Sequence, residues 1–140
     1  MGIDFGTVRT GLAVTDPAGI IASALGTVPS AGLIHHLKNY TSKDEVEGFV
    51  VGLPIHLDGR HTDATLAVLA FVEQLKGAFP DQWVETVDER FTSSMARQTL
   101  LQSGKGRMAR REKGQLDRIS ATIILQGWLE QRSSASRRSV

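Results

Sequence analysis

The first 28 residues, MGIDFGTVRTGLAVTDPAGIIASALGTV, contain three short apolar runs separated by turn signals. The runs cover Met1–Phe5, Gly11–Thr15 and Ile20–Val28, and the turn signals fall at Thr7–Arg9 and Asp16–Gly19. Short strands joined by tight turns of this kind are typical of antiparallel pairing. We therefore predict that the chain opens as a three-stranded antiparallel meander.

The rest of the chain alternates amphipathic stretches with apolar runs, which is typical of an α/β domain. Helical spacing of apolar residues predicts helices over Ser30–Lys43 with Ser30 as the cap, Thr62–Ala78, Thr92–Gln102 and Leu116–Gln131. Strands are predicted at Gly48–Leu53, an unbroken apolar run buried on both faces, and at Gln82–Val87. This order predicts a mixed five-stranded sheet, three antiparallel strands and then parallel ones, with helices on both faces.

Composition restricts the kind of protein. A length of 140 residues fits one domain, which we place at residues 1–132 and follow with a disordered basic tail at 133–140. The absence of cysteine excludes disulfides and thiolate metal sites. No apolar run approaches the roughly 20 residues of a membrane helix. We therefore expect a soluble, cytoplasmic protein with no membrane partner.

The net charge of +1 conceals an uneven distribution. Residues 1–96 hold 6 Lys or Arg and 12 Asp or Glu, whereas residues 97–140 hold 10 and 3. Five of the later cations, in the segment before Asp117, are Lys105, Arg107, Arg110, Arg111 and Lys113. Such a basic segment suits contact with the phosphates of a nucleic acid, although a solvated helix and tail would carry similar charge. Few aromatic residues lie among these cations, so base stacking is not expected. Trp128 is predicted to be a core residue.

Asp4 is the first candidate for chemistry, because aspartate is unfavourable in the middle of a strand. A buried carboxylate needs a compensating partner, which a cation can supply. Gly2 and Gly6 flank it and leave room for a ligand or a neighbouring backbone. The ordinary alternatives are exposure at a strand end or an ion pair with Arg9.

A second candidate lies where the strand Gln82–Val87 ends, at Asp88 and Glu89. Ligands of open α/β sheets collect beyond the carboxyl ends of strands. Adjacent strand residues point to opposite faces, so one of the two carboxylates is expected to join Asp4 and the other to be structural. Beside them, three residues could serve a phosphate at the start of the following helix: Arg90, Thr92 and Ser93.

The third candidate is Asp117, which lies at the border of the apolar stripe of the last predicted helix. The ordinary alternative to a role as a metal ligand is an ion pair with Lys113 or Arg118. Three carboxylates suit Mg²⁺, or Mn²⁺, which prefer oxygen ligands and phosphates. Two such ions can activate water against a phosphodiester. The four histidines lack zinc-ligand spacing and are predicted to lie on the surface.

Four motifs, read in order, resemble the YqgF family, also called RuvX. They are Gly2-Ile3-Asp4-Phe5-Gly6-Thr7-Val8-Arg9-Thr10-Gly11, Val51-Gly52-Leu53-Pro54 with Leu57-Asp58-Gly59, Val87-Asp88-Glu89-Arg90-Phe91-Thr92, and Asp117-Arg118-Ile119-Ser120-Ala121. The resemblance implies an RNase H-like fold related to the Holliday-junction resolvase RuvC. It also implies a nuclease that matures the 5′ end of 16S rRNA, with Asp4, Glu89 and Asp117 as the catalytic, metal-binding acids.

Three alternatives remain at this stage. The first motif also opens actin-like and sugar-kinase ATPases, but these need two such domains. A Holliday-junction resolvase on branched DNA is nearer, and a non-catalytic RNA-binding factor of ribosome assembly is a third. The expected partner is ribosomal precursor RNA in preference to branched DNA, with the ribosome as a further candidate partner. Both a monomer and a homodimer are compatible with the sequence.

Overall fold

The computed structural model describes residues 1–90 and 121–132. Its strands form one mixed sheet in the order β3-β2-β1-β4-β5. They are β1 (Gly2–Asp4), β2 (Arg9–Thr15), β3 (Ala22–Pro29), β4 (Gly48–Leu53) and β5 (Trp83–Asp88). The first three strands pair antiparallel, whereas β1, β4 and β5 run parallel. The predicted α/β class and the mixed five-stranded sheet are confirmed.

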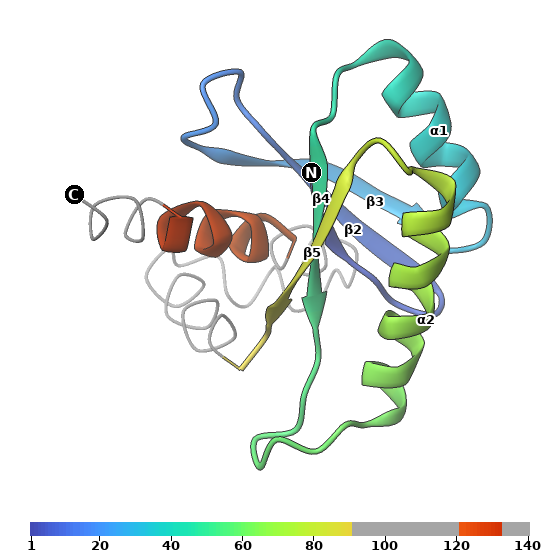
Figure 1. Ribbon diagram of the computed structural model, residues 1–140, viewed down its shortest axis with the longest axis vertical. Coiled ribbons are helices and arrows are strands. Elements are labelled where there is room, and N and C mark those ends of the chain that lie inside the picture. The colour runs from blue at the N-terminus through green and yellow to red at the C-terminus, as the bar shows by residue number, and fades with distance from the viewer. Residues whose placement is uncertain (91–120, 133–140) are drawn as a thin grey trace.

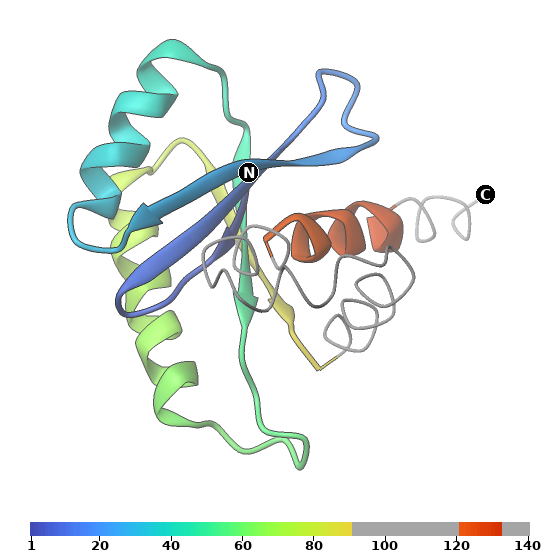
Figure 2. The same cartoon turned by 180° about the vertical axis from the view of Figure 1, so that it is seen from behind.

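Helices cover both faces of this sheet, as predicted. Helices α1 (Leu33–Lys43) and α2 (Asp63–Ala78) lie on one face, and the helix over residues 121–132 lies on the other (Figures 1 and 2). Within the described residues, no helix is long and apolar enough to cross a membrane. The predicted helix Thr92–Gln102, the first part of Leu116–Gln131 and the tail at 133–140 lie outside the described residues.

Strand alternation divides the apolar residues into two cores. Ile3 and Val51 belong to the core under α1 and α2, whereas Val50 and Val87 belong to the core under the helix over residues 121–132. Because β4 lies between covered faces along its whole length, five of its six residues are buried. This explains why its sequence is an unbroken apolar run without polar alternation.

At two of the predicted boundaries that are wrong, a polar side chain has a different partner from the one expected. Asp16 accepts hydrogen bonds from the backbone N–H groups of Ile20 (2.7 Å) and Ile21 (2.8 Å), so β3 begins only at Ala22. Ser30 does not cap α1, whose N-cap is Gly32. The Ser30 hydroxyl instead donates to the Gly6 carbonyl, tying the end of β3 to the β1–β2 turn.

Candidate functional site

Asp4 is the last residue of β1, not the middle of a longer strand over Met1–Phe5 as predicted. The next residue, Phe5, packs against the same core as Ile3, where its ring stacks on Phe71 with 4.5 Å between ring centroids. Asp4 is half-buried and lies opposite Gly11 of β2. It therefore stands at the carboxyl end of a central strand, where ligands of α/β sheets collect.

The face on which Asp4 lies follows from its neighbours in β1. Ile3 faces the core under α1 and α2, so Gly2 and Asp4 face the helix over residues 121–132. That helix approaches β1 closely: a Cβ atom on Gly2 would lie 2.9 Å from the carbonyl oxygen of Ala121. The absence of a side chain at Gly2 thus allows the helix to pack beside Asp4.

Glu89 follows β5 directly and reaches toward the same place. Its backbone N–H donates to the carbonyl of Leu53 at 3.0 Å, which keeps the end of β5 against β4. Its carboxylate lies over Gly52: a Cβ atom there would be 2.6 Å from Glu89 Oε1 and 2.4 Å from Ile124 Cδ1. Glu89 is thus directed to the face of the sheet that carries Ile124.

Register brings Asp4 and Glu89 to one face of the sheet, on either side of β4. Ile3 of β1 lies beside Val51 of β4 in parallel pairing, so Asp4 is level with Gly52. Burial, and secondarily the charge of Asp88, raise the pKa of the Glu89 carboxyl above its usual range. Two carboxylates at this corner, one with a raised pKa, form a place where a cation would be favourable.

Asp88 has a different role in the structure. Its Oδ2 atom accepts hydrogen bonds from Arg90 Nε at 2.9 Å and Arg90 Nη2 at 2.7 Å, and its Oδ1 accepts the Arg90 backbone N–H at 2.9 Å. The Arg90 hydrogen bond is the main cause that lowers the pKa of the Asp88 carboxyl. A bidentate pair of this kind fixes the guanidinium plane. Asp88 therefore orients Arg90, while Glu89 is directed over Gly52.

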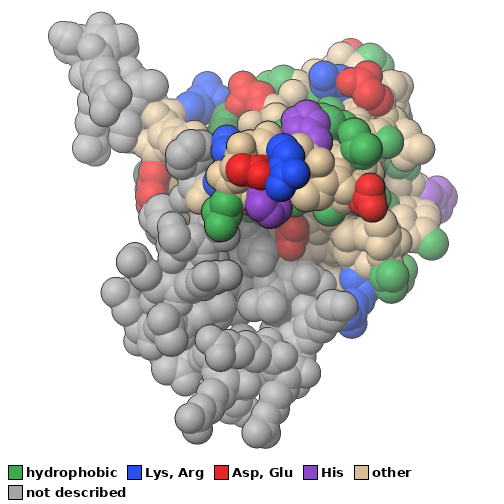
Figure 3. Space-filling view, turned by 90° about the horizontal axis from the view of Figure 1, so that it is seen from below, with side chains coloured by type: hydrophobic (Ala, Val, Ile, Leu, Met, Phe, Trp, Pro, Cys, Tyr) green, Lys and Arg blue, Asp and Glu red, His purple; other side chains and the backbone are tan. Residues whose placement is uncertain are grey.

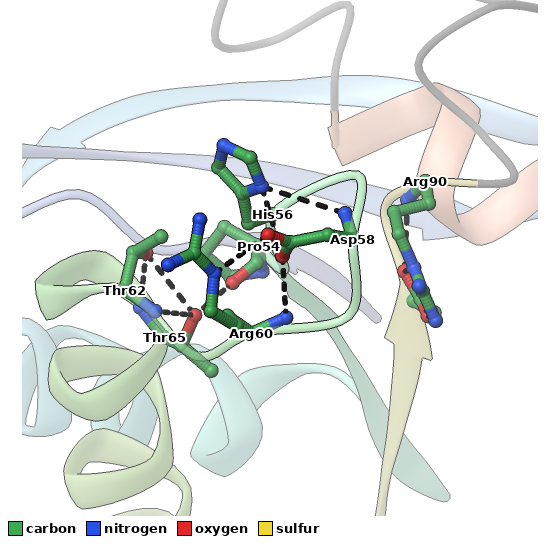
Figure 4. A network of polar contacts seen from close by, with 8 residues as sticks. Pro54, His56, Asp58, Arg60, Thr62, Thr65 and Arg90 are labelled. Carbon is green, nitrogen blue, oxygen red and sulfur yellow. Dashed lines mark hydrogen bonds and ion pairs between the residues drawn. The ribbon is translucent and has the colours of Figure 1, made fainter.

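The β4–α2 loop carries a network of polar contacts near Arg90 (Figure 4). Asp58 accepts a hydrogen bond from Arg60 Nε at 2.6 Å, and one of its oxygens lies 2.9 Å from His56 Nδ1. A Cβ atom on Gly59 would lie 3.5 Å from Arg90 Nη1, so the loop borders Arg90. Figure 3 shows this end of the molecule, where charged side chains and histidines gather. The Asp58-Gly59 pair, a turn signal, is the one local feature of the sequence that could have indicated this loop.

The remaining predicted site residues are placed in part. Arg9 is exposed at the start of β2. The rest lie outside the described residues: Thr92, Ser93, Lys105, Arg107, Arg110, Arg111, Lys113 and Asp117. Within residues 1–90 and 121–132, no group of three metal-binding side chains comes together. All four histidines are exposed, as predicted.

Comparison with known proteins gives a consistent result over nearly the whole chain. The family model described as RuvX, Holliday junction resolvase, matches residues 1–131. A protein of Flavobacterium johnsoniae named "Putative pre-16S rRNA nuclease" is 46% identical over 129 residues, which cover 92% of this chain and 94% of that protein. Proteins of the same name from Porphyromonas gingivalis (93% of this chain, 94% of that protein) and Chlorobium luteolum (94% and 93%) are 45% and 47% identical.

These matches agree with the four motifs, which follow one another in the order of the family from Gly2 to Ala121. Identity of about 45% extends over more than 90% of this chain and of each of these relatives. The chain therefore belongs to the RuvX family.

Proposed function

We propose that this protein is a metal-dependent nuclease that hydrolyses phosphodiester bonds of precursor 16S rRNA in the maturation of its 5′ end. The observation that carries the proposal is the position of the Glu89 carboxylate over Gly52, on the face and at the level of Asp4. The substrate follows from the names of the relatives, which are pre-16S rRNA nucleases by description. A role in ribosome biogenesis implies a cytoplasmic protein with the ribosome as a candidate partner, as a monomer or a homodimer.

The residues fit Mg²⁺ or Mn²⁺. Asp4 and Glu89 supply hard oxygen ligands, and the bare backbone of Gly52 leaves the space that the Glu89 carboxylate occupies. The raised pKa of Glu89 means that ionisation is unfavourable at this position without a counter-charge. Asp117 is the proposed third ligand. It lies four positions before Ala121 in the chain, and Ala121 packs beside Gly2. A bound ion would acidify water and stabilise the departing oxygen of a phosphodiester.

Cationic side chains are proposed to position the RNA strand around these acids. Arg90, oriented by Asp88, and Arg9 are the two within the described residues. Contacts of this kind bind phosphates and do not read bases. The other cations belong to the segment after β5: Lys105, Arg107, Arg110, Arg111 and Lys113. The hydroxyl groups of Thr92 and Ser93 are proposed to donate hydrogen bonds to a phosphate beside them.

A second candidate function is cleavage of branched DNA, which the description of the family model as a Holliday junction resolvase favours. Purified protein is offered a precursor 16S rRNA fragment and a four-way DNA junction, each with Mg²⁺, Mn²⁺ or chelator. We expect cleavage of the RNA with either metal and none with chelator. Preferred cleavage of the junction would select the resolvase, and RNA binding without cleavage would select a non-catalytic assembly factor.

A pair of matched variants ties this activity to the site. Glu89→Gln keeps the shape of the side chain and removes its charge, and we expect cleavage to fall at least about 100-fold. Glu73→Gln makes the same change on the exposed surface of α2, where the Glu73 side chain is 77% accessible, and should leave cleavage unchanged. Equal activity of the two variants would remove Glu89 from the mechanism.

A further inference from the structure

A cavity of about 590 Å³ opens beside β5, at the edge of the sheet. One wall is the stretch of β5 from Glu85 to Asp88, and the other is formed by Trp128, Gln131 and Arg132. Pockets that hold small organic ligands have roughly this size, about 300–1,000 Å³. The cavity ends at Asp88, the residue before Glu89.

An aromatic stack stands at the cavity wall. The ring of Trp128 lies against that of Trp83 with 5.0 Å between centroids and 25° between planes. The guanidinium of Arg132 lies over the Trp128 ring at 4.9 Å from its centroid. Trp128 Nε1 donates a hydrogen bond to the Glu85 carboxylate, which fixes the indole in its plane. Trp128 was predicted to be core, yet it is only half-buried and lines an open cavity.

The cavity lies next to the corner that holds Asp4 and Glu89, because its lining residue Asp88 immediately precedes Glu89 in the chain. Trp83 and Val87 of β5 face the helix over residues 121–132, so the two-residue period places Glu85 on the same face. On the helix, Ile124 contacts the position of Gly52 under the Glu89 carboxylate, and Trp128 follows one turn later. The Trp128 ring therefore lies on the same face of the sheet as the Glu89 carboxylate, one helical turn beyond Ile124.

The chemistry of the lining favours an uncharged flat group over a phosphate. Glu85 and Asp88 make the β5 wall acidic, which repels a phosphate, although Arg90 balances Asp88. Trp128 with Arg132 offers a preorganised stacking surface, and every nucleobase has a π-face for it. Trp128 uses one oxygen of the Glu85 carboxylate, and the second can accept a hydrogen bond from a base.

We propose that this cavity binds a nucleobase of the substrate RNA, next to the phosphate that is cleaved, stacked on the Arg132 guanidinium that lies over the Trp128 ring. The inference rests on the proposed nuclease function and adds to it. The acids and cations act on the phosphates, whereas this cavity holds the base of a neighbouring unpaired nucleotide. Single-stranded RNA is thus the substrate class that the site selects, because a paired base cannot enter it.

The test uses the fluorescence of the protein itself, since its two tryptophans are the two rings of this stack. Full-length protein in chelator is titrated with a short single-stranded RNA and with an abasic strand that has the same number of phosphates. We expect the RNA to change the fluorescence and to bind roughly 5- to 150-fold more tightly than the abasic strand. Equal affinity for the two strands would overturn the inference.

Two variants locate the effect. Arg132→Ala removes an exposed side chain from the stack, and Trp128→Phe keeps a ring while losing the hydrogen bond to Glu85. Each should reduce the preference for the base-bearing strand, whereas Lys76→Ala, which removes a cation from α2, should lower the affinity for both strands equally or not at all. An unchanged preference in both cavity variants would place the base elsewhere and contradict the proposal.

The outcomes separate this inference from the nuclease proposal, because binding is measured in chelator and can be repeated with Asp4→Asn. Cleavage by a protein that binds both strands equally would overturn the base site alone. A protein that prefers the base-bearing strand but never cleaves RNA would overturn the nuclease proposal alone.

Discussion

The carboxylate of Glu89 occupies the space that a side chain at Gly52 would need, 2.6 Å from the ideal Cβ position. Gly52 belongs to β4, which lies between β1, whose last residue is Asp4, and β5, which Glu89 follows directly. A glycine on the middle strand thus lets the acids at the ends of the two flanking strands share one face. Both the proposed chemistry and its sensitivity to substitution follow from this contact.

Gly52→Ala should therefore impair cleavage although no acid is changed. The new methyl group would meet both Glu89 Oε1 and Ile124 Cδ1, so the carboxylate must move. We expect cleavage of precursor RNA to fall by at least about tenfold, because misplaced active-site groups lose large factors in rate.

Gly77→Ala is the matched control for this substitution. Gly77 lies in α2 with open space around its Cβ position, so the change should leave cleavage intact and stabilise the fold by about 0.4–1 kcal/mol. Equal activity of the Gly52→Ala variant and wild type would show that the position of Glu89 over β4 does not matter.

Glu89→Gln should stabilise the metal-free protein at neutral pH. Burial and the charge of Asp88 raise the pKa of Glu89 in the folded state, so the folded protein takes up the proton more readily than the unfolded chain. The contribution of this group to stability is therefore present at low pH and lost as the pH rises through the raised pKa. Glutamine remains neutral and avoids that loss.

The measurement is the thermal midpoint of both proteins in chelator between about pH 4 and pH 8, a range that spans the ordinary pKa of glutamate. We expect the Glu89→Gln variant to have the higher midpoint at pH 7 and the difference to vanish near pH 4. Addition of Mg²⁺ should raise the midpoint of the wild type more than that of the variant. A variant with the lower midpoint at pH 7 would mean that ionised Glu89 stabilises the metal-free fold.

Asp88→Asn should behave differently from Glu89→Gln, because Asp88 holds Arg90. We expect a loss of activity of about tenfold, as for residues that orient active-site groups. The charge of Asp88 also raises the pKa of Glu89, so its removal should shift the acid limb of the pH–rate profile to lower pH. A shift to higher pH, or complete inactivation, would indicate that Asp88 itself is a ligand.

Thr62→Ala tests the start of α2. The Thr62 hydroxyl accepts a hydrogen bond from the Thr65 backbone N–H at 3.3 Å, and the Thr65 hydroxyl accepts one from the Thr62 backbone N–H at 2.9 Å. Loss of such a cap should lower the free energy of unfolding by about 1 kcal/mol, measured by urea denaturation. Ser42→Ala, in the exposed last turn of α1, should change it by less than about 0.5 kcal/mol, and an equal loss in both variants would contradict the capping role.

The sequence pattern predicted the helices and strands whose bounds depend on residues close to them in the chain. Gly48–Leu53 was predicted to the residue because an unbroken apolar run reflects burial on both faces, and the helix Thr62–Ala78 was predicted from the spacing of its apolar residues. The prediction that Ser30 caps α1 was wrong because the Ser30 hydroxyl is used in a tertiary contact with Gly6. The prediction that the third strand begins at Ile20 was wrong because the Ile20 N–H donates to the Asp16 side chain. Neither partner can be identified from sequence spacing.

The site was predicted unevenly for the same reason. Strand alternation indicated that Asp88 and Glu89 would separate, and the motif favoured Glu89 for the metal. The role of Gly52 could not be foreseen, because it depends on β4 lying between β1 and β5. Trp128 was assigned to the core by its helical position, but its stack with Trp83 and Arg132 requires the packing of the helix over residues 121–132 against β5.

The most direct test of the central claim is cleavage of a precursor 16S rRNA fragment by the wild type, Asp4→Asn and Asp81→Asn in Mg²⁺, Mn²⁺ or chelator. Asp81 is exposed in the turn before β5 and serves as the matched control. We predict metal-dependent cleavage by the wild type and Asp81→Asn, and none by Asp4→Asn, which should still fold and bind the RNA. Undiminished cleavage by Asp4→Asn, or cleavage that persists in chelator, would contradict a metal-dependent nuclease built on Asp4 and Glu89.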